Sequence, residues 1–329
     1  MTAMHTKIQE YQLQNDAGLI VRFTNLGGRI TSIKLPGKEH DTDIIAGAKQ
    51  TNDYISQDEY MGAICGRSAN RIENASFLLN GTKIQLSKNA DNNHLHGGFN
   101  GFHTKYWQVS IINGQRCQLD YLSPDGEEGY PGKLKVTAIY ELNNENEFRI
   151  LFTANSDKAT IVNLTSHPYF NLKGFGSILD HQLWVHAGKF TPLNKELVPS
   201  GKFEDLKNTR YDFRTRKTLS SVFRKFNMHG IDQNFVLSNN GQFQKIAELS
   251  HPETGRSLEL FSSQPGLQIY TGMHFRSTTG KDGNALGPNM AIALEPQQLP
   301  NCPNLPEFGN SILQKEECYE HTILYKFNY

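Results

Sequence analysis

The sequence contains little of what marks secreted, metal-binding or membrane proteins. Its 329 residues include four cysteines, none in a CxxC spacing, which argues against both a zinc knuckle and a disulfide framework. No run of about 18 uncharged apolar residues occurs, and the first residues lack the apolar segment of a signal peptide. We therefore expect reduced thiols and a soluble, cytoplasmic protein.

An excess of charge of one sign is also missing. The 33 Lys and Arg residues balance 33 Asp and Glu residues, and no long basic run is present. Nucleic-acid-binding proteins usually carry a basic patch, so this charge balance implies no polyanionic partner. We expect a small-molecule ligand, with neither nucleic acid nor membrane as a partner.

The pattern that is present is typical of a mainly β protein. Short β-branched or aromatic runs recur from end to end, broken by Gly, Asn, Asp and Pro, and few stretches have helical periodicity. We predict one domain over residues 1–329, built as a large antiparallel β-sandwich of two packed sheets with few short helices. The predicted strands are residues 6–13, 19–23, 28–35, 133–142, 146–155, 182–186, 234–237, 257–261 and 322–328. The predicted helix covers residues 217–226, whose apolar positions have helical spacing.

His167 is the first candidate for chemistry. It lies in the strand-like run TIVNLTSHPYFNLKG, and Pro168 disfavours a helical backbone at the residue before it. We expect His167 to project from a stiff strand end beside Tyr169 and Phe170, where its imidazole could act as a proton donor against the face of a ring-shaped ligand. The alternative is a histidine that is hydrogen-bonded at a strand end for structural reasons.

Two further motifs carry basic side chains. Arg67 and Arg71 lie four residues apart among small residues, and their guanidinium donors suit hydroxyl or carboxylate oxygens, although a salt bridge or a solvated surface would explain them equally. His94 and His96 would point to the same side of an extended segment. A metal site is not expected there, because no third ligand cluster is evident.

Two acidic residues complete the candidates. Asp232 precedes a predicted strand, where it is either a turn former or a pocket residue. Glu295 would lie at a strand end before Pro296, on the side opposite Ile292 and Leu294 and beside small alanines. A carboxylate in such an apolar environment tends to have a raised pKa, as a general base near neutral pH requires. A surface glutamate is the alternative.

Taken together, the motifs resemble those of the aldose 1-epimerases, also called galactose mutarotases. The blocks that carry this resemblance span nearly the whole chain: NLGGRITSIKLPG, GAICGRSANRI, HLHGG, SPDGEEGYPGKL, TIVNLTSHPYFNL, FTPLNKELVPSG, DFR, GIDQNFVL, SLELFSSQPGLQIYTG and ALEPQQLPN. The resemblance implies the family's fold, a β-supersandwich with an open sugar cleft. It also implies the family's reaction, the interconversion of the α and β anomers of free hexoses such as galactose and glucose without cofactor or metal.

The resemblance also implies a role for each candidate. Glu295 would be the general base, His167 the general acid and His96 an assistant near the ring oxygen, while Arg71 and Asp232 would hold the sugar hydroxyls. The chain departs from the family pattern at three positions. The family usually has Asn where Ser166 stands, commonly Thr or Ser where Pro168 stands, and commonly Asp where Asn301 stands. None of the three departures removes a proposed catalytic group, but they leave rate and substrate preference open.

Three alternatives remain at this level. A hexose-6-phosphate epimerase would need further cations at the cleft mouth, such as Arg22, Arg29 or Arg67. A glycosidase could use Asp232 and Glu295 as its carboxylate pair. A non-catalytic carbohydrate-binding protein would need neither a base nor an acid. The sequence leaves open whether the sugar is galactose, glucose or a pentose, and whether the protein is a monomer or a homodimer.

Overall fold

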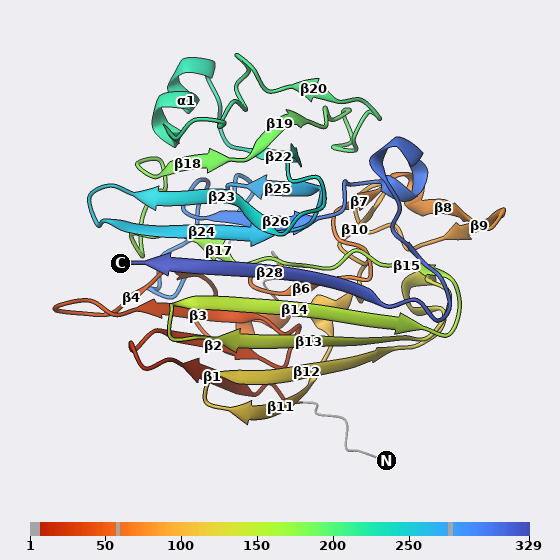
Figure 1. The fold of residues 1–329 in the computed structure, drawn as a ribbon, viewed down its shortest axis with the longest axis horizontal. Coiled ribbons are helices and arrows are strands. Elements are labelled where there is room, and N and C mark those ends of the chain that lie inside the picture. Colours follow the sequence, from red (N-terminus) through yellow and green to blue (C-terminus); the bar gives the residue numbers. More distant parts are fainter. Residues whose placement is uncertain (1–6, 57–59, 276–278) are drawn as a thin grey trace.

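The fold consists of two layers of antiparallel strands. The computed structural model describes residues 7–56, 60–275 and 279–329, and every pair of named strands in these ranges is antiparallel. The front layer in Figure 1 is a sheet of nine strands. In spatial order these are β11 (Gln108–Asn113), β12 (Arg116–Ser123), β13 (Leu134–Leu142), β14 (Glu147–Ser156), β28 (Tyr319–Asn328), β24 (Arg256–Ser262), β23 (Gln244–His251), β18 (Gln182–Val185) and β21 (Lys217–Thr218).

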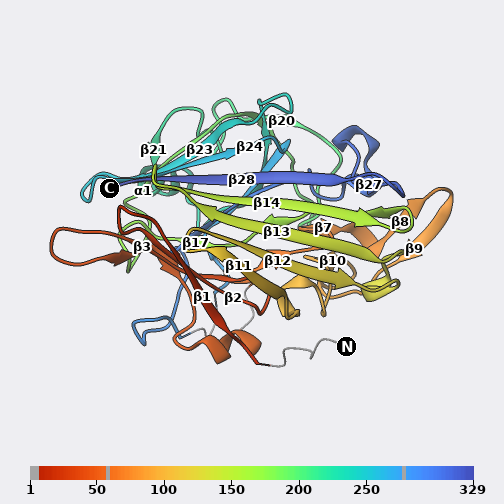
Figure 2. The ribbon, with the colours of Figure 1, turned by 60° about the horizontal axis from the view of Figure 1, so that its bottom comes forward.

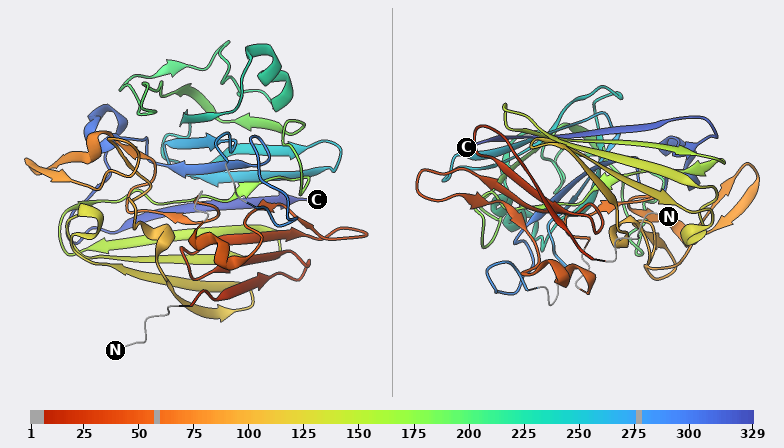
Figure 3. Two further views of the ribbon diagram at one scale, coloured as in Figure 1. Left: turned by 180° about the vertical axis from the view of Figure 1, so that it is seen from behind. Right: turned by 90° about the horizontal axis from the view of Figure 1, so that it is seen from below.

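The second layer is made of two sheets that lie side by side behind the first (Figure 3). The larger contains β20 (Glu204–Asp205), β19 (Ala187–Phe190), β22 (Asp232–Leu237), β25 (Gly266–Tyr270), β26 (Ile292–Gln297), β17 (Tyr169–Phe170) and β5 (Ile45–Ala46). The smaller contains β1 (Glu10–Gln14), β2 (Ile20–Thr24), β3 (Ile30–Leu35) and β4 (Thr42–Asp43).

Short two-stranded ladders and helices complete the fold. The ladders pair β7 (Arg71–Ile72) with β10 (His94–Leu95), β6 (Ile64–Cys65) with β16 (Thr165–Ser166), β8 (Ser76–Leu79) with β9 (Thr82–Gln85), and β15 (Thr160–Ile161) with β27 (Ile312–Leu313). The α-helix is α1 (Leu219–Phe226), and the short 3₁₀ turns are Thr51–Ile55, Glu73–Ala75, Phe102–Thr104, Glu127–Gly129, Cys302–Asn304 and Pro306–Phe308. None of the helices in the described ranges is long and apolar enough to span a lipid bilayer.

One hydrophobic core fills the space between the layers, which are seen at a tilt in Figure 2. In β13, alternate residues from Leu134 to Leu142 are buried, because successive side chains of a strand point to opposite faces. These side chains share one buried cluster with Leu267 and Leu294 of the second layer and with Val21 of the smaller sheet. The layers are therefore packed face to face, as the strand pattern predicts.

The strand predictions are confirmed where the alternation is clear. Strands β1 and β2 form the predicted hairpin, β13 and β14 pair over their whole length, and α1 lies within the predicted helix. Residue 6, at the start of the first predicted strand, lies outside the described residues. Strands β11, β12 and β23 are not among the predicted strands. Their alternation is interrupted by exposed apolar or buried polar residues such as Ile111, Leu122 and His251.

Candidate active site

The candidate site is a pocket on the face of the seven-stranded sheet that is turned away from the core. Its floor comes from three adjacent strands, β22, β25 and β26, in which Gln268 lies opposite Glu295 in the register. The loops around β7 and β10, together with the segment between β16 and β17, form its walls. Residues that lie far apart in the sequence therefore meet in one pocket.

Glu295 reaches the pocket because of strand alternation in β26. Ile292 and Leu294 belong to the main core, whereas Ala293 and Glu295 lie on the opposite face, as predicted from the sequence. The predicted strand end is wrong, since β26 continues through Pro296 to Gln297. β17 pairs with β26 only at Ile292 and Ala293, so on that side of β26 the missing N–H of Pro296 costs no ladder hydrogen bond.

The carboxylate of Glu295 is in an environment that disfavours its charge. Only 1% of the residue is exposed, and this burial raises the pKa of Glu295 well above its ordinary value. The nearby charge of Asp232 raises this pKa further, and the guanidinium of Arg71 opposes the shift. The raised pKa expected for a general base is therefore found, with burial as its main cause.

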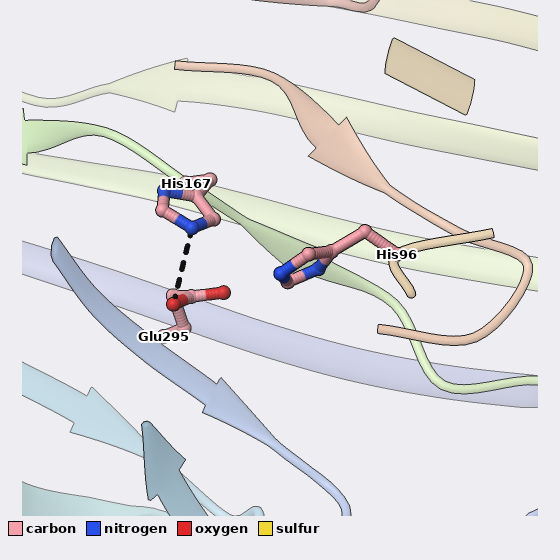
Figure 4. Close-up of side chains that lie close together, drawn as sticks. All are labelled: His96, His167 and Glu295. Atoms are coloured by element: carbon pink, nitrogen blue, oxygen red, sulfur yellow. Dashed lines mark ion pairs between the residues drawn. The ribbon is translucent and has the colours of Figure 1, made fainter. Parts of the chain in front are cut away.

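His167 faces Glu295 directly. Its backbone is held between β16 and β17 by two hydrogen bonds, from His167 N–H to the carbonyl of Ala63 and from Gly62 N–H to the carbonyl of His167. The Nε2 atom of His167 lies 3.3 Å from Oε1 of Glu295 (Figure 4). The other carboxylate oxygen, Oε2, is buried and has no hydrogen-bond partner within the described part of the chain.

His96 completes a group of three. One nitrogen or oxygen atom from each of His96, His167 and Glu295 lies within 4.8 Å of the other two, and Figure 4 shows the His96 imidazole pointing towards Glu295. The backbone N–H of Asn70 donates a hydrogen bond to Nδ1 of His96 over 3.3 Å. This contact assigns the proton of the neutral ring to Nε2.

His94 does not join the pocket, which corrects the expectation that both histidines point to one side. His96 has a φ of +48°, in the left-handed region, so the segment is not extended there and the alternation of side chains is broken. The ring of His94 instead lies 2.7 Å from the carbonyl oxygen of Ser87 and 2.7 Å from the hydroxyl of Tyr130. Burial lowers the pKa of His94, consistent with a structural role.

Arg71 and Asp232 both line the pocket, as predicted. Sequence reasoning did not single out Asn70 and Gln268, which lie beside them. The amide of Asn70 donates to Oε1 of Gln268 over 3.0 Å, and the amide of Gln268 donates to Oδ1 of Asp232 over 2.6 Å. The alternation of GLQIY could have indicated that Gln268 has its side chain on one face with Tyr270, but only the strand pairing places it beside Glu295.

The remaining arginines are not in the pocket. Arg67 is buried and donates to the carbonyl oxygens of Ser123, Pro124, Pro131 and Gly132, so it joins loops together. Arg29 is buried against the carbonyls of Met61 and His103, and Arg22 donates to Gln12 on the surface. The three cations considered for a sugar phosphate therefore lie elsewhere.

Two groups of side chains in the described ranges have the spacing of metal ligands. In both groups, the hydrogen bonds of the histidine rings place protons on the nitrogens that would have to bind the metal, so neither group fits a metal site. In the pocket, Nδ1 of His96 already accepts a hydrogen bond, so Nε2 of the neutral ring carries the proton and offers no lone pair to a metal. In the second group, Nε2 of His181 accepts from Leu172 N–H and Nδ1 of His251 accepts from Thr254 N–H. The other nitrogen of each ring then carries a proton that faces Asp180.

Comparison with known proteins agrees with this geometry. A family model described as aldose 1-epimerase matches residues 9–326. The chain is 36% identical to a galactose mutarotase from Mus musculus, covering 98% of this chain and 94% of the relative. It is 35% identical to an aldose 1-epimerase from Haemophilus influenzae, covering 91% and 88%.

Solved structures show the same fold. A galactose 1-epimerase from Lactobacillus acidophilus superposes with a TM-score of 0.85 at 29% identity and 99% coverage of both chains. An aldose epimerase homologue from C. elegans gives a TM-score of 0.93 at 24% identity, covering 98% of this chain and 99% of that one. Sequence, fold and pocket thus agree, and the chain belongs to the aldose 1-epimerase family of isomerases.

Proposed function

We propose that this protein interconverts the α and β anomers of free hexoses such as galactose and glucose by acid and base catalysis, with Glu295 as base and His167 as acid. The observation that carries the proposal is the buried pair of Glu295 and His167, whose Oε1 and Nε2 atoms lie 3.3 Å apart, in a pocket that Arg71 and Asp232 also line. A base and an acid in one pocket with hydroxyl-binding groups suit a single sugar ring.

The first step is the removal of the anomeric hydroxyl proton. Oε2 of Glu295 is the acceptor, since it is buried and has no hydrogen-bond partner within the described part of the chain, whereas Oε1 faces His167. His167 donates a proton from Nε2 to the ring oxygen, and the bond from C1 to O5 breaks. At 3.3 Å, the contact between His167 and Glu295 is longer than a charge-assisted hydrogen bond, so this N–H can turn to the sugar.

The open-chain aldehyde then rotates about its C1 to C2 bond and closes on the other face. On closure, His167 takes the proton back from the attacking hydroxyl, and Glu295 returns its proton to the new anomeric oxygen. The intermediate is neutral, so the steps require no electron sink and no hydride carrier. Each positioned acid or base contributes about 10²- to 10⁴-fold to the rate.

The other pocket residues bind and orient the ring. The Nε2–H group of His96 would donate to the ring oxygen and assist His167. The guanidinium of Arg71 offers donors, and the carboxylate of Asp232 offers acceptors, for sugar hydroxyls. Gln268 and Asn70 hold Asp232 through two consecutive amide hydrogen bonds.

The test is polarimetry on freshly dissolved α-D-galactose and α-D-glucose, with wild-type protein, Glu295→Gln and the surface control Glu320→Gln. We expect the wild type and the control to accelerate the approach to anomeric equilibrium. The Glu295→Gln variant should lose about 10²- to 10⁴-fold in kcat, because an amide cannot take the proton, while it still binds the sugar. Full activity in Glu295→Gln would show that another group is the base.

We further propose that the protein works in the cytoplasm as a single domain covering residues 1–329. The scattered spacing of the four cysteines, none in a CxxC pair, supports this location. The main hydrophobic core supports a single domain, because it unites side chains from β1 to β28.

A further inference from the structure

The strand that carries His167 separates from the strand that carries Glu295 where these two residues would pair. Strands β17 and β26 are antiparallel partners, with Tyr169 opposite Ala293. Continued by two residues, this register would set His167 opposite Glu295. The backbone N–H and C=O of His167 are instead bonded to residues 62–63. A backbone ladder therefore does not set the distance between the acid and the base.

Two buried side chains span the gap that the ladder leaves. The hydroxyl of Thr165 donates a hydrogen bond to the carbonyl oxygen of Pro296 over 2.9 Å. The side-chain oxygen of Asn163 accepts one from the N–H of Gln298 over 2.9 Å. Both side chains are buried, so these bonds are shielded from water. Pro296 directly follows Glu295 in the chain, so the bond of Thr165 is the one nearer to the base.

Glu295 depends on its backbone for the position of its carboxylate. Strand β26 pairs with β25 over its whole catalytic end, but on the other side it pairs with β17 only at Ile292 and Ala293. Of the two carboxylate oxygens, Oε1 faces His167, and Oε2 is buried without a hydrogen-bond partner among the described residues. A shift of the backbone at Pro296 would therefore be passed on to the carboxylate.

The backbone on the Thr165 side is fixed independently of the Thr165 hydroxyl. Thr165 pairs with Cys65 in the short ladder of β16 and β6. The N–H of Leu164 donates to the hydroxyl of Tyr319 over 3.0 Å, and Nδ1 of His321 donates to the carbonyl oxygen of Leu164 over 2.9 Å. Both of these side chains come from β28 in the other layer. Removal of the hydroxyl should therefore leave this strand in place and release its contact with β26.

We propose that Thr165 is a positioning residue, whose hydroxyl fixes the carboxylate of Glu295 relative to the imidazole of His167. Its hydrogen bond ends one residue from the base, and Thr165 itself lies two residues from the acid. The reacting side chains are 3.3 Å apart (Figure 4), and a misplacement of about 1 Å can cost about 100-fold in rate. This inference rests on the proposed function, because it concerns the same acid and base.

The test uses two comparisons in which the hydroxyl is lost, Thr165→Val against the wild type and Thr165→Ala against Thr165→Ser. The control is Thr24→Val in the smaller sheet. Thr24 is also fully buried, and its hydroxyl donates to a backbone carbonyl oxygen, that of Leu26, over 3.0 Å. Polarimetry on α-D-galactose gives kcat and KM separately, and urea denaturation gives the stability of each protein.

We expect kcat of Thr165→Val to fall about 10- to 100-fold, with little change in KM, because Arg71 and Asp232 are untouched. Thr165→Ser should keep most of the activity, since it retains the donor, and Thr165→Ala should lose as much as Thr165→Val. Thr24→Val should lose stability to a similar degree, because it also loses one buried hydrogen bond, but should keep the kcat of the wild type. If Thr165→Val does not fold, the comparison of Thr165→Ala with Thr165→Ser decides the question.

Several results would overturn the inference. They are a wild-type kcat in the folded variants that lack the Thr165 hydroxyl, a loss in Thr165→Ser as large as that in Thr165→Ala, and an equal loss of kcat in Thr24→Val. A rise in KM at unchanged kcat would place Thr165 in sugar binding instead. No acceleration of any sugar by the wild type would contradict the proposed function itself, together with the positioning role that rests on it.

Discussion

Glu295 is the residue whose environment most directly predicts behaviour in solution. Burial and Asp232 raise its pKa, and Arg71 lowers it. The proposed base is active only when ionised. The value of kcat/KM should therefore fall as the pH drops below this raised pKa, and the acid limb of the pH profile should lie well above the ordinary range of a glutamate.

Changing the two neighbouring charges should move this limb in opposite directions. In Asp232→Asn the raising charge is lost, so the pKa of Glu295 falls and the acid limb moves to lower pH. In Arg71→Gln the lowering charge is lost, so the limb moves to higher pH. The measurement is kcat/KM against pH by polarimetry, with Glu320→Gln as a control that should leave the limb in place. Shifts in the same direction in both variants would contradict this account.

Gln268 should affect binding more than chemistry. It donates to Asp232 and accepts from Asn70, but it is not a proton donor or acceptor in the proposed steps. Gln268→Met keeps the side-chain length and removes both hydrogen bonds, and the loss of a hydrogen bond to a charged group should raise KM about 10-fold with a smaller change in kcat. Separate determination of KM and kcat checks this, and a loss confined to kcat would assign Gln268 to the chemical step.

At the scale of elements, β26 joins the core to the site. Its residues alternate between Leu294, which belongs to the main hydrophobic core, and Glu295, which faces the pocket. The same alternation was visible in the sequence, since it depends only on the local period of a strand. The continuation through Pro296 was not, because strand length depends on pairing with β25.

Truncation on the core side of β26 should destabilise the whole fold. Leu294→Ala removes a fully buried side chain and leaves a cavity, so the free energy of unfolding should fall by about 2–5 kcal/mol. Leu122→Ala is the matched control, because Leu122 is 61% exposed and its truncation should change stability by no more than about 0.5 kcal/mol. Urea denaturation measures both, and equal losses would argue against the described packing of β26.

The loop at His96, unlike β26, has a conformation that the local sequence pattern does not predict. The spacing of His94 and His96 predicts one common side, but the positive φ of His96 directs the two rings apart. The contacts of Asn70 with the backbone and ring of His96 hold this conformation, and Asn70 is 26 residues away. A local pattern does not predict such a turn.

At the scale of the whole molecule, buried histidines should make stability depend on pH. Burial lowers the pKa of His181 and of His321 to about 4. Both are neutral in the folded state and have a higher pKa when unfolded, so the unfolded state binds protons first as the pH falls. The stability they contribute is complete above pH of about 6.5 and is lost as the pH falls towards about 4, on the order of 3 kcal/mol for each.

The free energy of unfolding, measured by urea denaturation between these two pH values, should therefore decrease with falling pH. His321→Gln removes one of the two groups, so the slope of stability against pH should become smaller whatever its effect on absolute stability. The exposed His40→Gln is the control and should leave the slope unchanged. An unchanged slope in His321→Gln would mean that this ring is not held neutral in the fold.

The sequence by itself determined the strand-rich class, the hairpins of β1–β2 and β13–β14, α1, and the face of β26 that carries Glu295, because these follow from side-chain periods and turn residues within one segment. Its motifs also determined the family and named the five residues that meet in or around the pocket. The tertiary structure alone decided that Arg67 holds loops while Arg71 lines the pocket, that His94 turns away from His96, and that Gln268 lies beside Glu295. These outcomes depend on strand register and on contacts between segments up to about 200 residues apart, such as that of Asn70 with Gln268, and no local pattern encodes such pairings.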